Sequence, residues 1–400
     1  MSRGKDREEQ RRTEKKVGKA AGVSKEEWEV IMKEIRQKYH FTPQKGWMND
    51  PNGLIYAEGK YHIFYQHYPE DTKWGPMHWG HAVSEDLLHW EHLPIALYPT
   101  EDEYAFSGSA ILDHENLSGL GDGTKPPMLL FYTGHNPKTW EQQQCLAFST
   151  DYIHFEKYGA NPIVANPGEI AGEPNPNYRK DFRDPKVLAN LVRGGFTMVL
   201  AMGEEIGFFH STDLFHWEYT GSFVPGAFGY GGICECPDLF ACRVDDEEKY
   251  VLSMSMVFAN ENGPGEIHLM QYFVGDFDGD TFRPCQPFAQ ENLLDFGKDN
   301  YAMVGFAECN ELLMLGWGED WDEARVNTHR EYFGKLTLAR KVQMIKVGDR
   351  YLLKQTPVWN SLDENCPGGN AWRSVEEDVF RDDFTLSEGG EYSFRFSSIM

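Results

Sequence analysis

The feature that most constrains the fold of this chain is an eight-residue segment that recurs along it. The segment begins with Ser, has Asp at its third position and ends with His, an aromatic residue and Glu. Its three clear copies begin at Ser84, Ser149 and Ser211, so the starts are 65 and 62 residues apart, and a weaker copy begins 64 residues later at Gly275. Several short apolar runs bounded by turn-forming residues separate the copies. A repeat of this length predicts the blades of a β-propeller.

The spacing leaves room for five blades, and we therefore predict an all-β, five-bladed β-propeller over residues 41–347. The composition agrees, because 14% aromatic residues and 39 Gly suit short strands joined by tight turns. Each copy of the repeat is expected to form the turn into the outer strand of a blade. The segment that follows each copy then opens the next blade beside the central channel.

The two ends of the chain do not follow this pattern. Residues 1–40 carry a net charge of +4, against −29 for the remainder, and contain one helix predicted over about 25–38, after a capping box that starts at Ser24. Residues 348–400 are expected to begin a C-terminal β-sandwich. Because only about fifty residues follow the propeller, this module is predicted to be truncated or reduced, with unpaired edge strands.

The charge and the cysteines limit the partners and the compartment. A formal net charge of −25 disfavours nucleic acids and anionic membranes, because affinity for phosphate groups comes from Lys and Arg. No apolar run approaches the roughly 18 residues of a membrane span, and the basic start lacks the apolar core of a secretory signal. Seven Cys without the spacing of a disulfide framework suit free thiols. We therefore expect a cytoplasmic protein that binds a small, neutral, hydroxyl-rich ligand.

Acidic residues occur in register with the repeat, where new blades open. Asp50 lies in the turn sequence Asn-Asp-Pro-Asn-Gly, and both Asp184 and Glu235 lie within two residues of a proline. Each acid taken alone would be interpreted as part of a surface turn. Because the inner strands of a propeller begin at one end of its channel, these three carboxylates are expected to converge there. Their common register favours a functional role over a structural one.

Converging carboxylates suit two kinds of chemistry. A pair of carboxylates hydrolyses glycosidic bonds when one protonates the leaving oxygen and the other attacks the anomeric carbon or activates water. Burial and mutual repulsion move the pKa values of such groups apart, which allows the two roles. Three acids also suit a hard cation with oxygen ligands. The sequence lacks a calcium-loop signature, so we predict neither a metal nor another cofactor.

The histidines fall into two groups. His89, His154 and His216 recur at the same position of the repeat and are interpreted as structural. For His78 and His81, which lie in the sequence Trp-Gly-Pro-Met-His-Trp-Gly-His, a packing role and a substrate role both remain open.

At these positions the sequence resembles glycoside hydrolase family 32, the group of invertases, sucrose-6-phosphate hydrolases and fructanases. The resemblance extends over most of residues 40–345. The matching segments occur in the order of the family, and they are Trp47–Gly53, Phe64–Gln66, Trp79–His81, Phe106–Ser109, Arg183–Lys186, Glu235–Leu239 and Gly316–Trp317.

The resemblance implies a five-bladed propeller and a retaining β-fructofuranosidase acting on sucrose, sucrose 6-phosphate or short fructans by double displacement at fructose C2. In such an enzyme Asp50 would be the nucleophile and Glu235 the acid/base, while Asp184 would hold fructose hydroxyls and stabilise the transition state. No cofactor is implied. The resemblance also places the following residues around the fructosyl unit: Asn49, Gln66, Trp74, Phe106, Ser107, Arg183 and Trp317.

Three other functions remain open for the same acids: a transfructosylase, a non-catalytic sugar-binding propeller, and an inverting pentose-releasing enzyme of similar fold. The sequence also departs from the family at two points. Cys234 stands where members often carry a bulky aromatic residue, so the pocket wall beside Glu235 is expected to be altered. The segment after the propeller is much shorter than the β-sandwich that members append.

Overall fold

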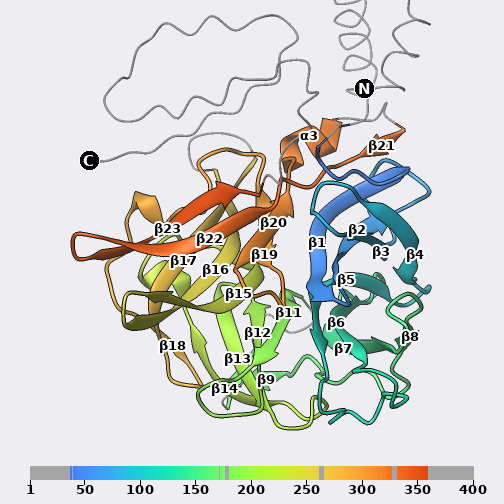
Figure 1. The fold of residues 1–400 in the computed structure, drawn as a ribbon, viewed down its shortest axis with the longest axis horizontal. Coiled ribbons are helices and arrows are strands. Elements are labelled where there is room, and N and C mark those ends of the chain that lie inside the picture. The colour runs from blue at the N-terminus through green and yellow to red at the C-terminus, as the bar shows by residue number, and fades with distance from the viewer. Residues whose placement is uncertain are drawn as a thin grey trace, which may run out of the picture. The chain divides into compact units, whose positions relative to one another are not determined.

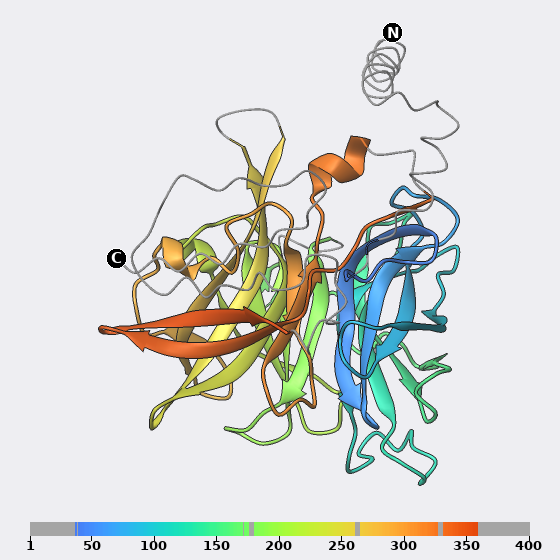
Figure 2. The same cartoon turned by 45° about the horizontal axis from the view of Figure 1, so that its top comes forward.

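The computed structural model of the chain describes residues 37, 39–170, 172–175, 180–260, 265–326 and 331–358. These residues form strands almost throughout (Figures 1 and 2). The helix predicted over about 25–38, residue 37 excepted, and the sandwich strands predicted beyond residue 358 lie outside them. Within the described part of the chain, no helix is both long and apolar enough to cross a membrane.

Five sheets make up the body of the protein, and four of them have four strands in chain order. The first sheet has the order β21-β1-β2-β3-β4, with β1 (Gly46–Ala57), β2 (Lys60–Tyr68), β3 (His78–Ser84), β4 (Glu91–Leu97) and the short β21 (Tyr332–Phe333). The second contains β5 (Tyr104–Leu112), β6 (Met128–His135), β7 (Gln142–Ser149) and β8 (Glu156–Lys157). The third contains β11 (Phe182–Ala189), β12 (Phe196–Met202), β13 (Glu205–Ser211) and β14 (Glu218–Phe223).

The fourth sheet contains β15 (Ile233–Val244), β16 (Glu247–Ala259), β17 (Glu266–Phe277) and β18 (Phe282–Pro284). The fifth contains β19 (Tyr301–Gly305), β20 (Leu313–Trp317), β22 (Arg340–Val347) and β23 (Arg350–Pro357). The remaining short elements are the hairpin of β9 (Glu169–Ile170) and β10 (Glu173–Pro174), the 3₁₀ turns Pro225–Ala227 and Gln290–Asn292, and α3 (Trp321–Val326).

The five sheets form a closed ring. The inner strands β1, β5, β11, β15 and β19 contact one another in this order, and β19 returns to contact β1. The parallel pairing of β21 with β1, in which Gly46 lies opposite Tyr332, helps to close it. In Figures 1 and 2 the blades follow one another in colour order, and the orange strands of the fifth come back beside the blue β1. The prediction of an all-β, five-bladed propeller is confirmed.

The core of the protein lies between neighbouring blades. Phe64 and Trp79 of the first blade pack with Leu130 and Tyr132 of the second, and all four side chains are buried. Because both faces of a blade are covered in this way, its middle strands are apolar over long runs instead of alternating with polar residues. All eight residues of β6, for example, are buried.

The recurring segment forms the turn between the third and outer strands of a blade. In the copy between β13 and β14, Ser211 Oγ accepts the N–H of Leu214 at 2.9 Å, and Asp213 Oδ1 accepts the N–H groups of Phe215 and His216 at 3.0 and 2.8 Å. The ring of His216 contacts Asp213 Oδ2 through Nδ1. These contacts are local, which explains why the segment recurs with the period of the fold.

The copies at Ser84 and Ser149 make the same bonds, with His89 and His154 against the Asp of each copy. The structural interpretation of the repeat histidines is therefore confirmed.

We expect Ser211→Ala to lower the free energy of unfolding by about 1–2 kcal/mol, because it leaves the buried N–H of Leu214 without its acceptor. Urea unfolding of the two proteins measures this difference. Thr212→Ala, at the exposed next position, is the control and should change the free energy by less than about 0.5 kcal/mol. Equal effects of the two substitutions would contradict a capping role for the serine.

The propeller continues past the boundary expected at residue 347. Strand β23 pairs with β22 along its whole length, from the pair Val347 and Arg350 to the pair Arg340 and Pro357. The two residues between the strands form a tight hairpin, helped by Gly348, whose φ of 59° is favourable for glycine. Residues 350–357, expected to begin the sandwich, therefore form the outer strand of the fifth blade.

Candidate active site

The candidate site lies at the end of the channel where the inner strands begin. One extra residue is inserted in β11 just after Arg183, and another in β15 just after Glu235. Each insertion shifts the pairing with the next strand. The inserted stretches contain Asp184 and Cys236, which have φ values of 63° and 44°. Such bulges redirect side chains, and non-glycine residues persist in the left-handed region where their surroundings hold them.

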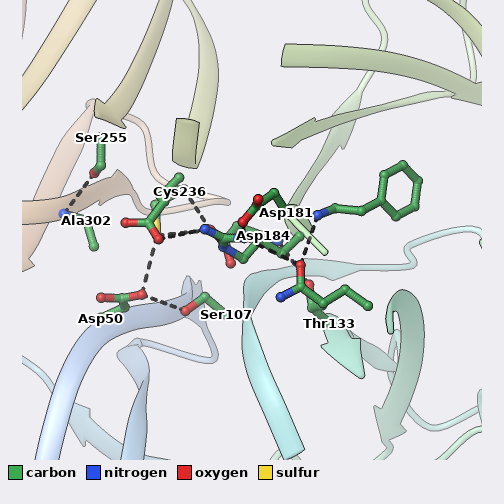
Figure 3. A network of polar contacts seen from close by, with 12 residues as sticks. Asp50, Ser107, Thr133, Asp181, Asp184, Cys236, Ser255 and Ala302 are labelled. Carbon is green, nitrogen blue, oxygen red and sulfur yellow. Dashed lines mark hydrogen bonds and ion pairs between the residues drawn. The ribbon is translucent and has the colours of Figure 1, made fainter. Parts of the chain in front are cut away.

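Asp50 lies in β1, and its two carboxylate oxygens differ (Figure 3). Oδ2 accepts a hydrogen bond from Ser107 Oγ at 2.8 Å and lies 3.5 Å from the Sγ of Cys236. Oδ1 is buried and accepts no hydrogen bond from any residue that the structure describes. A buried carboxylate oxygen without a donor is unusual in a folded protein and is available to a ligand.

Asp184 lies beside Asp50, across the same thiol. Its Oδ2 accepts the backbone N–H of Cys236 at 2.9 Å and lies 3.6 Å from the Sγ of that residue. The backbone N–H of Asp184 donates to Thr133 Oγ1 at 2.9 Å, which anchors the bulge to the second blade. Figure 3 shows Asp50, Asp184 and Cys236 close together.

Glu235 is held from both sides. Its Oε1 accepts a hydrogen bond from Nη2 of Arg183 at 2.8 Å, and its Oε2 accepts one from the hydroxyl of Tyr301. Nη1 of Arg183 donates to Asp181 Oδ1 at 2.7 Å, while its Nε lies 3.9 Å from Asp184 Oδ2. One guanidinium is thus shared among three carboxylates.

Burial controls the protonation of the site. It raises the pKa of Asp50, and the charge of Glu235 adds to this rise. Burial also raises the pKa of Asp184 to about 7, although Arg183 opposes the shift. Burial likewise raises the pKa of the Cys236 thiol well above its usual range, so the thiol is neutral. The charge of Asp50 also raises the pKa of Asp184, so the protonation of these two acids is coupled.

The raised pKa of Asp184 predicts a pH-dependent contribution to stability. A carboxyl that binds its proton more tightly in the folded state stabilises the fold fully below its unfolded pKa of about 4, and this contribution is lost as pH rises to about 7. As pH rises from about 4 to about 7, the free energy of unfolding of the wild type should therefore decrease relative to that of Asp184→Asn. The decrease should be about 1.4 kcal/mol per unit of difference between the folded and unfolded pKa.

Urea unfolding of both proteins at several pH values between 4 and 7 tests this. Asp246→Asn, which removes an exposed carboxylate, controls for the change in net charge. Parallel curves for wild type and Asp184→Asn would contradict the prediction.

Two of the expected polar residues, Asn49 and Gln66, are buried. Asn49, next to Asp50 in β1, accepts a hydrogen bond from Nε1 of Trp47 at 2.6 Å. Gln66, at the end of β2, donates to the backbone oxygen of Ala105, which precedes Phe106, at 3.0 Å. Both amides therefore have fixed orientations.

The expected aromatic residues occupy two places. Phe106 stacks on His135 with ring centroids 4.3 Å apart and meets the half-exposed Trp74 edge-on at 5.9 Å. Trp317 is buried near the first blade, 6.2 Å from Trp47. Its Nε1 is buried and donates to no residue in the described ranges. Phe106 of the second blade packs against the core cluster that contains Trp317 of the fifth blade.

The residue expected to alter the pocket wall does not reach it. The side chain of Cys234 is fully buried in the core between the third and fourth blades, with its Sγ 3.9 Å from the sulfur of Met256. The expectation is therefore wrong, because neighbouring residues of a strand point to opposite faces and Cys234 is directed away from the site that Glu235 enters. The bulge after Glu235 directs Cys236 to the site. His81 is also turned inward, where its Nε2 contacts His62 at 3.1 Å, so packing is its observed role.

The site also contains residues that were not predicted from the sequence. Tyr301 binds Glu235, and Asp181 binds Arg183. A signal existed for Tyr301, because it opens the inner strand of the fifth blade in the same register as the three acids. Its side chain is a phenol, however, so it is not part of the pattern of carboxylates.

Beneath the acids the channel is nearly filled. A cavity of about 20 Å³ lies between the inner strands, with Ser107, Asp184, Lys186 and Cys236 in its wall, and it has room for about one water molecule. Among the described residues, no group of three or more His, Cys, Asp or Glu side chains is arranged to hold a metal ion.

Comparison with known sequences places the chain among carbohydrate-active proteins. The family model described as "Glycosyl hydrolases family 32 N-terminal domain" matches residues 40–357. The chain is 36% identical to a levanase of Bacillus subtilis (strain 168), over 91% of this chain and 55% of that protein. It is 37% identical to an invertase of Schizosaccharomyces pombe, over 82% of this chain and 57% of that protein. The chain thus spans a little more than half the length of these relatives.

Comparison with solved structures gives the same fold. The exo-inulinase of Aspergillus awamori superposes with a TM-score of 0.72 and 33% identity, over 81% of this chain and 67% of that one. The β-fructofuranosidase of Schwanniomyces occidentalis, solved with fructosyl-erythritol, gives a TM-score of 0.71 and 34% identity, over 82% of this chain and 63% of that one.

Proposed function

The chain belongs to glycoside hydrolase family 32, and on this premise we propose that it is a retaining β-fructofuranosidase. It would release fructosyl units from sucrose, sucrose 6-phosphate or short fructans by double displacement at fructose C2. The observation that carries the proposal is the meeting of Asp50, Asp184 and Glu235 around one guanidinium and one thiol. Relatives named levanase, invertase and exo-inulinase support this class of substrate.

Asp50 is the nucleophile in this proposal. Ser107 and the thiol of Cys236 hold its Oδ2, so the unpartnered Oδ1 is the oxygen that attacks C2. The attack forms a covalent fructosyl-enzyme, which water hydrolyses in the second step, and two inversions give net retention. Because C2 is attacked from a fixed direction, orientation supplies much of the rate enhancement.

Glu235 is the acid/base. It gives its proton to the leaving oxygen in the first step and takes a proton from the attacking water in the second. The hydroxyl of Tyr301 and the guanidinium of Arg183 each bind one of its oxygens and so fix the plane of the carboxyl group. Arg183 also stabilises the carboxylate that exists between the two steps.

Asp184 and the aromatic residues bind the fructosyl unit in this proposal. A carboxyl group with a raised pKa, in contact with the same thiol as the nucleophile, is suited to form hydrogen bonds with fructose hydroxyls and to stabilise developing positive charge. The apolar faces of the sugar would lie against rings, and the remaining polar groups would bind its hydroxyls. The lining residues are Asn49, Gln66, Trp74, Phe106, Ser107, Arg183 and Trp317. The chemistry requires no cofactor.

We also propose a cytoplasmic location, which fractionation of the source cells would check. The buried thiols of Cys145, Cys234 and Cys242 are free, as is usual in a reducing compartment. Some relatives, such as the Aspergillus exo-inulinases, are named as extracellular.

A substrate panel tests the proposed function. Purified full-length protein is incubated with sucrose, sucrose 6-phosphate, inulin and levan, and free fructose is measured. Release from at least one of them is expected. Absence of release from all four, by protein whose circular dichroism shows a folded β-structure, would overturn the proposal. Accumulation of longer oligosaccharides at high sucrose would instead assign transfructosylation to the same site.

A further inference from the structure

The exposed aromatic side chains of this protein gather at one end of the propeller. In the described ranges, the large exposed aromatic residues are Trp74, Tyr98, Trp140, Phe228, Tyr230 and Phe296. All of them lie in loops at the end where the inner strands begin, which is the end that carries the acids. At the opposite end the large exposed apolar residues are aliphatic, namely Leu117, Ile153, Leu191, Val192 and Val347. Val224 and Val326 are also exposed at the acid end, but no large exposed aromatic residue of the described ranges lies at the opposite end.

Two of these indoles flank the wall of the candidate active site. Phe106 and His135 form a parallel stack, with an angle of 9° between their planes. Trp74 stands edge-on to Phe106 at 5.9 Å, and Trp140 stands edge-on to His135 at 5.5 Å. Phe106 directly precedes Ser107, whose hydroxyl binds the proposed nucleophile. The surface made by the two indoles is therefore continuous with the site.

Trp140 is held in an unfavourable conformation. Its φ of 65° lies in the left-handed region, where bulky side chains are rare because this conformation costs stability. Its indole is 66% exposed, so burial of the ring does not offset that cost. The loop is tied at both ends: Trp140 N–H donates to Asn136 O, and Asn136 N–H donates to Glu141 O, both at 2.8 Å. An ion pair of 2.8 Å between Lys138 and Asp102 adds a third tie.

We propose that Trp140 extends the sugar-binding surface of Trp74 and Phe106 to the units of a fructan chain that lie beyond the unit held at Asp50. This inference rests on the proposed function and extends it to the substrate. Indole rings offer a broad, rigid apolar face with little loss of conformational entropy, and the C–H faces of sugar rings pack well against them. Lys138, the cation of the loop that carries Trp140, is already paired with Asp102, which favours a neutral ligand at this loop.

The buried ring between the two indoles agrees with a neutral ligand. Burial lowers the pKa of His135 to about 4, and the charge of Arg183 lowers it further in the same direction. The imidazole is therefore uncharged at neutral pH. A phosphorylated sugar beside Trp140 would find Lys138 already paired with Asp102 and His135 uncharged.

Trp140→Ala tests the proposal through a ratio of specificity constants. We measure kcat/KM for inulin and for sucrose in each variant, and expect the ratio of inulin to sucrose to fall about tenfold, since a ring contact of this kind contributes about 1.4 kcal/mol. Phe296→Ala is the matched control, because Phe296 is 72% exposed at the same end but in the loop that leads to the fifth blade. Its ratio should stay within twofold of wild type.

An unchanged ratio in Trp140→Ala, or an equal fall in both variants, would overturn the proposal. Trp140→Phe, which keeps a ring, should recover part of the lost ratio.

A binding measurement separates this inference from the proposed function. Calorimetry with a four-unit inulin oligosaccharide is performed on Glu235→Gln, with and without Trp140→Ala. A dissociation constant that is roughly tenfold larger in the double variant supports the outer surface. It does so even if no substrate is hydrolysed, and in that case only the proposed activity fails. Equal affinity in the two proteins would overturn the inference.

Discussion

Replacing Asp50 by asparagine is expected to lower kcat for fructose release by about 10⁴-fold or more, because the loss of a covalent nucleophile removes the reaction path itself. The amide has nearly the shape of the carboxylate and keeps an atom in contact with Ser107 Oγ, so the pocket should be preserved. It cannot attack C2, however. Initial rates on sucrose, with enzyme concentrations high enough to detect residual turnover, measure the effect.

The fold of Asp50→Asn should be unimpaired. Burial raises the pKa of Asp50, which shows that the charged form is disfavoured in the folded protein, so a neutral amide is tolerated there at neutral pH. Unfolding in urea checks this point. Ser107→Ala is the matched control, because it removes a hydrogen bond to the same carboxylate but not the nucleophile, and it should lower kcat only about tenfold. A rate for Asp50→Asn within tenfold of wild type would exclude Asp50 as the nucleophile.

Replacing Glu235 by glutamine is expected to lower kcat for sucrose by about 10²–10⁴-fold, the usual contribution of a general acid/base. The size of the loss should depend on the leaving group. An acidic leaving group departs without being protonated. Glu235→Gln should therefore slow the first step much less for a fructoside that carries such a group than for sucrose. Comparison of sucrose with such an activated fructoside measures the difference.

Rescue by azide distinguishes the two carboxylates. Azide attacks the fructosyl-enzyme without help from a base, so it should restore turnover of the activated fructoside by Glu235→Gln. It should not restore retaining turnover by Asp50→Asn, which forms no fructosyl-enzyme. Tyr301→Phe, which removes only the hydrogen bond to Oε2 of Glu235, should lose about tenfold in kcat. If Glu235→Gln lost the same factor in kcat on sucrose and on the activated fructoside, and azide restored no turnover, the acid/base role of Glu235 would be excluded.

The order of the blades was predictable because it depends on local interactions. Ser211 and Asp213 bind backbone groups no more than three residues away, and the same holds for the other copies of the repeat. A turn whose hydrogen bonds are made by its own side chains recurs with the same sequence wherever the fold contains such a turn. The fifth blade shows the limit of this approach, since its last turn is a hairpin at Gly348 that lacks the repeat. The boundary was accordingly placed too early.

The positions of the three acids were also predictable, because inner strands begin at one end of a propeller and Asp50, Asp184 and Glu235 keep the register of the repeat. Their partners were not all predictable. Tyr301 meets Glu235 across 66 residues of sequence and Cys236 meets Asp50 across 186. No pattern within either segment indicates such a contact.

The class of fold, the number of blades and the end of the channel where the acids lie could all be inferred from the sequence, because each follows from a period and from short-range hydrogen bonds. Only the tertiary structure decided which side chains reach the site. In a regular strand Cys234 and Cys236 would point to the same side of the sheet. The bulge after Glu235 breaks this alternation, so that Cys234 packs between two blades while Cys236 lies between Asp50 and Asp184. Its left-handed backbone is held by contacts with other blades, which the local sequence does not encode.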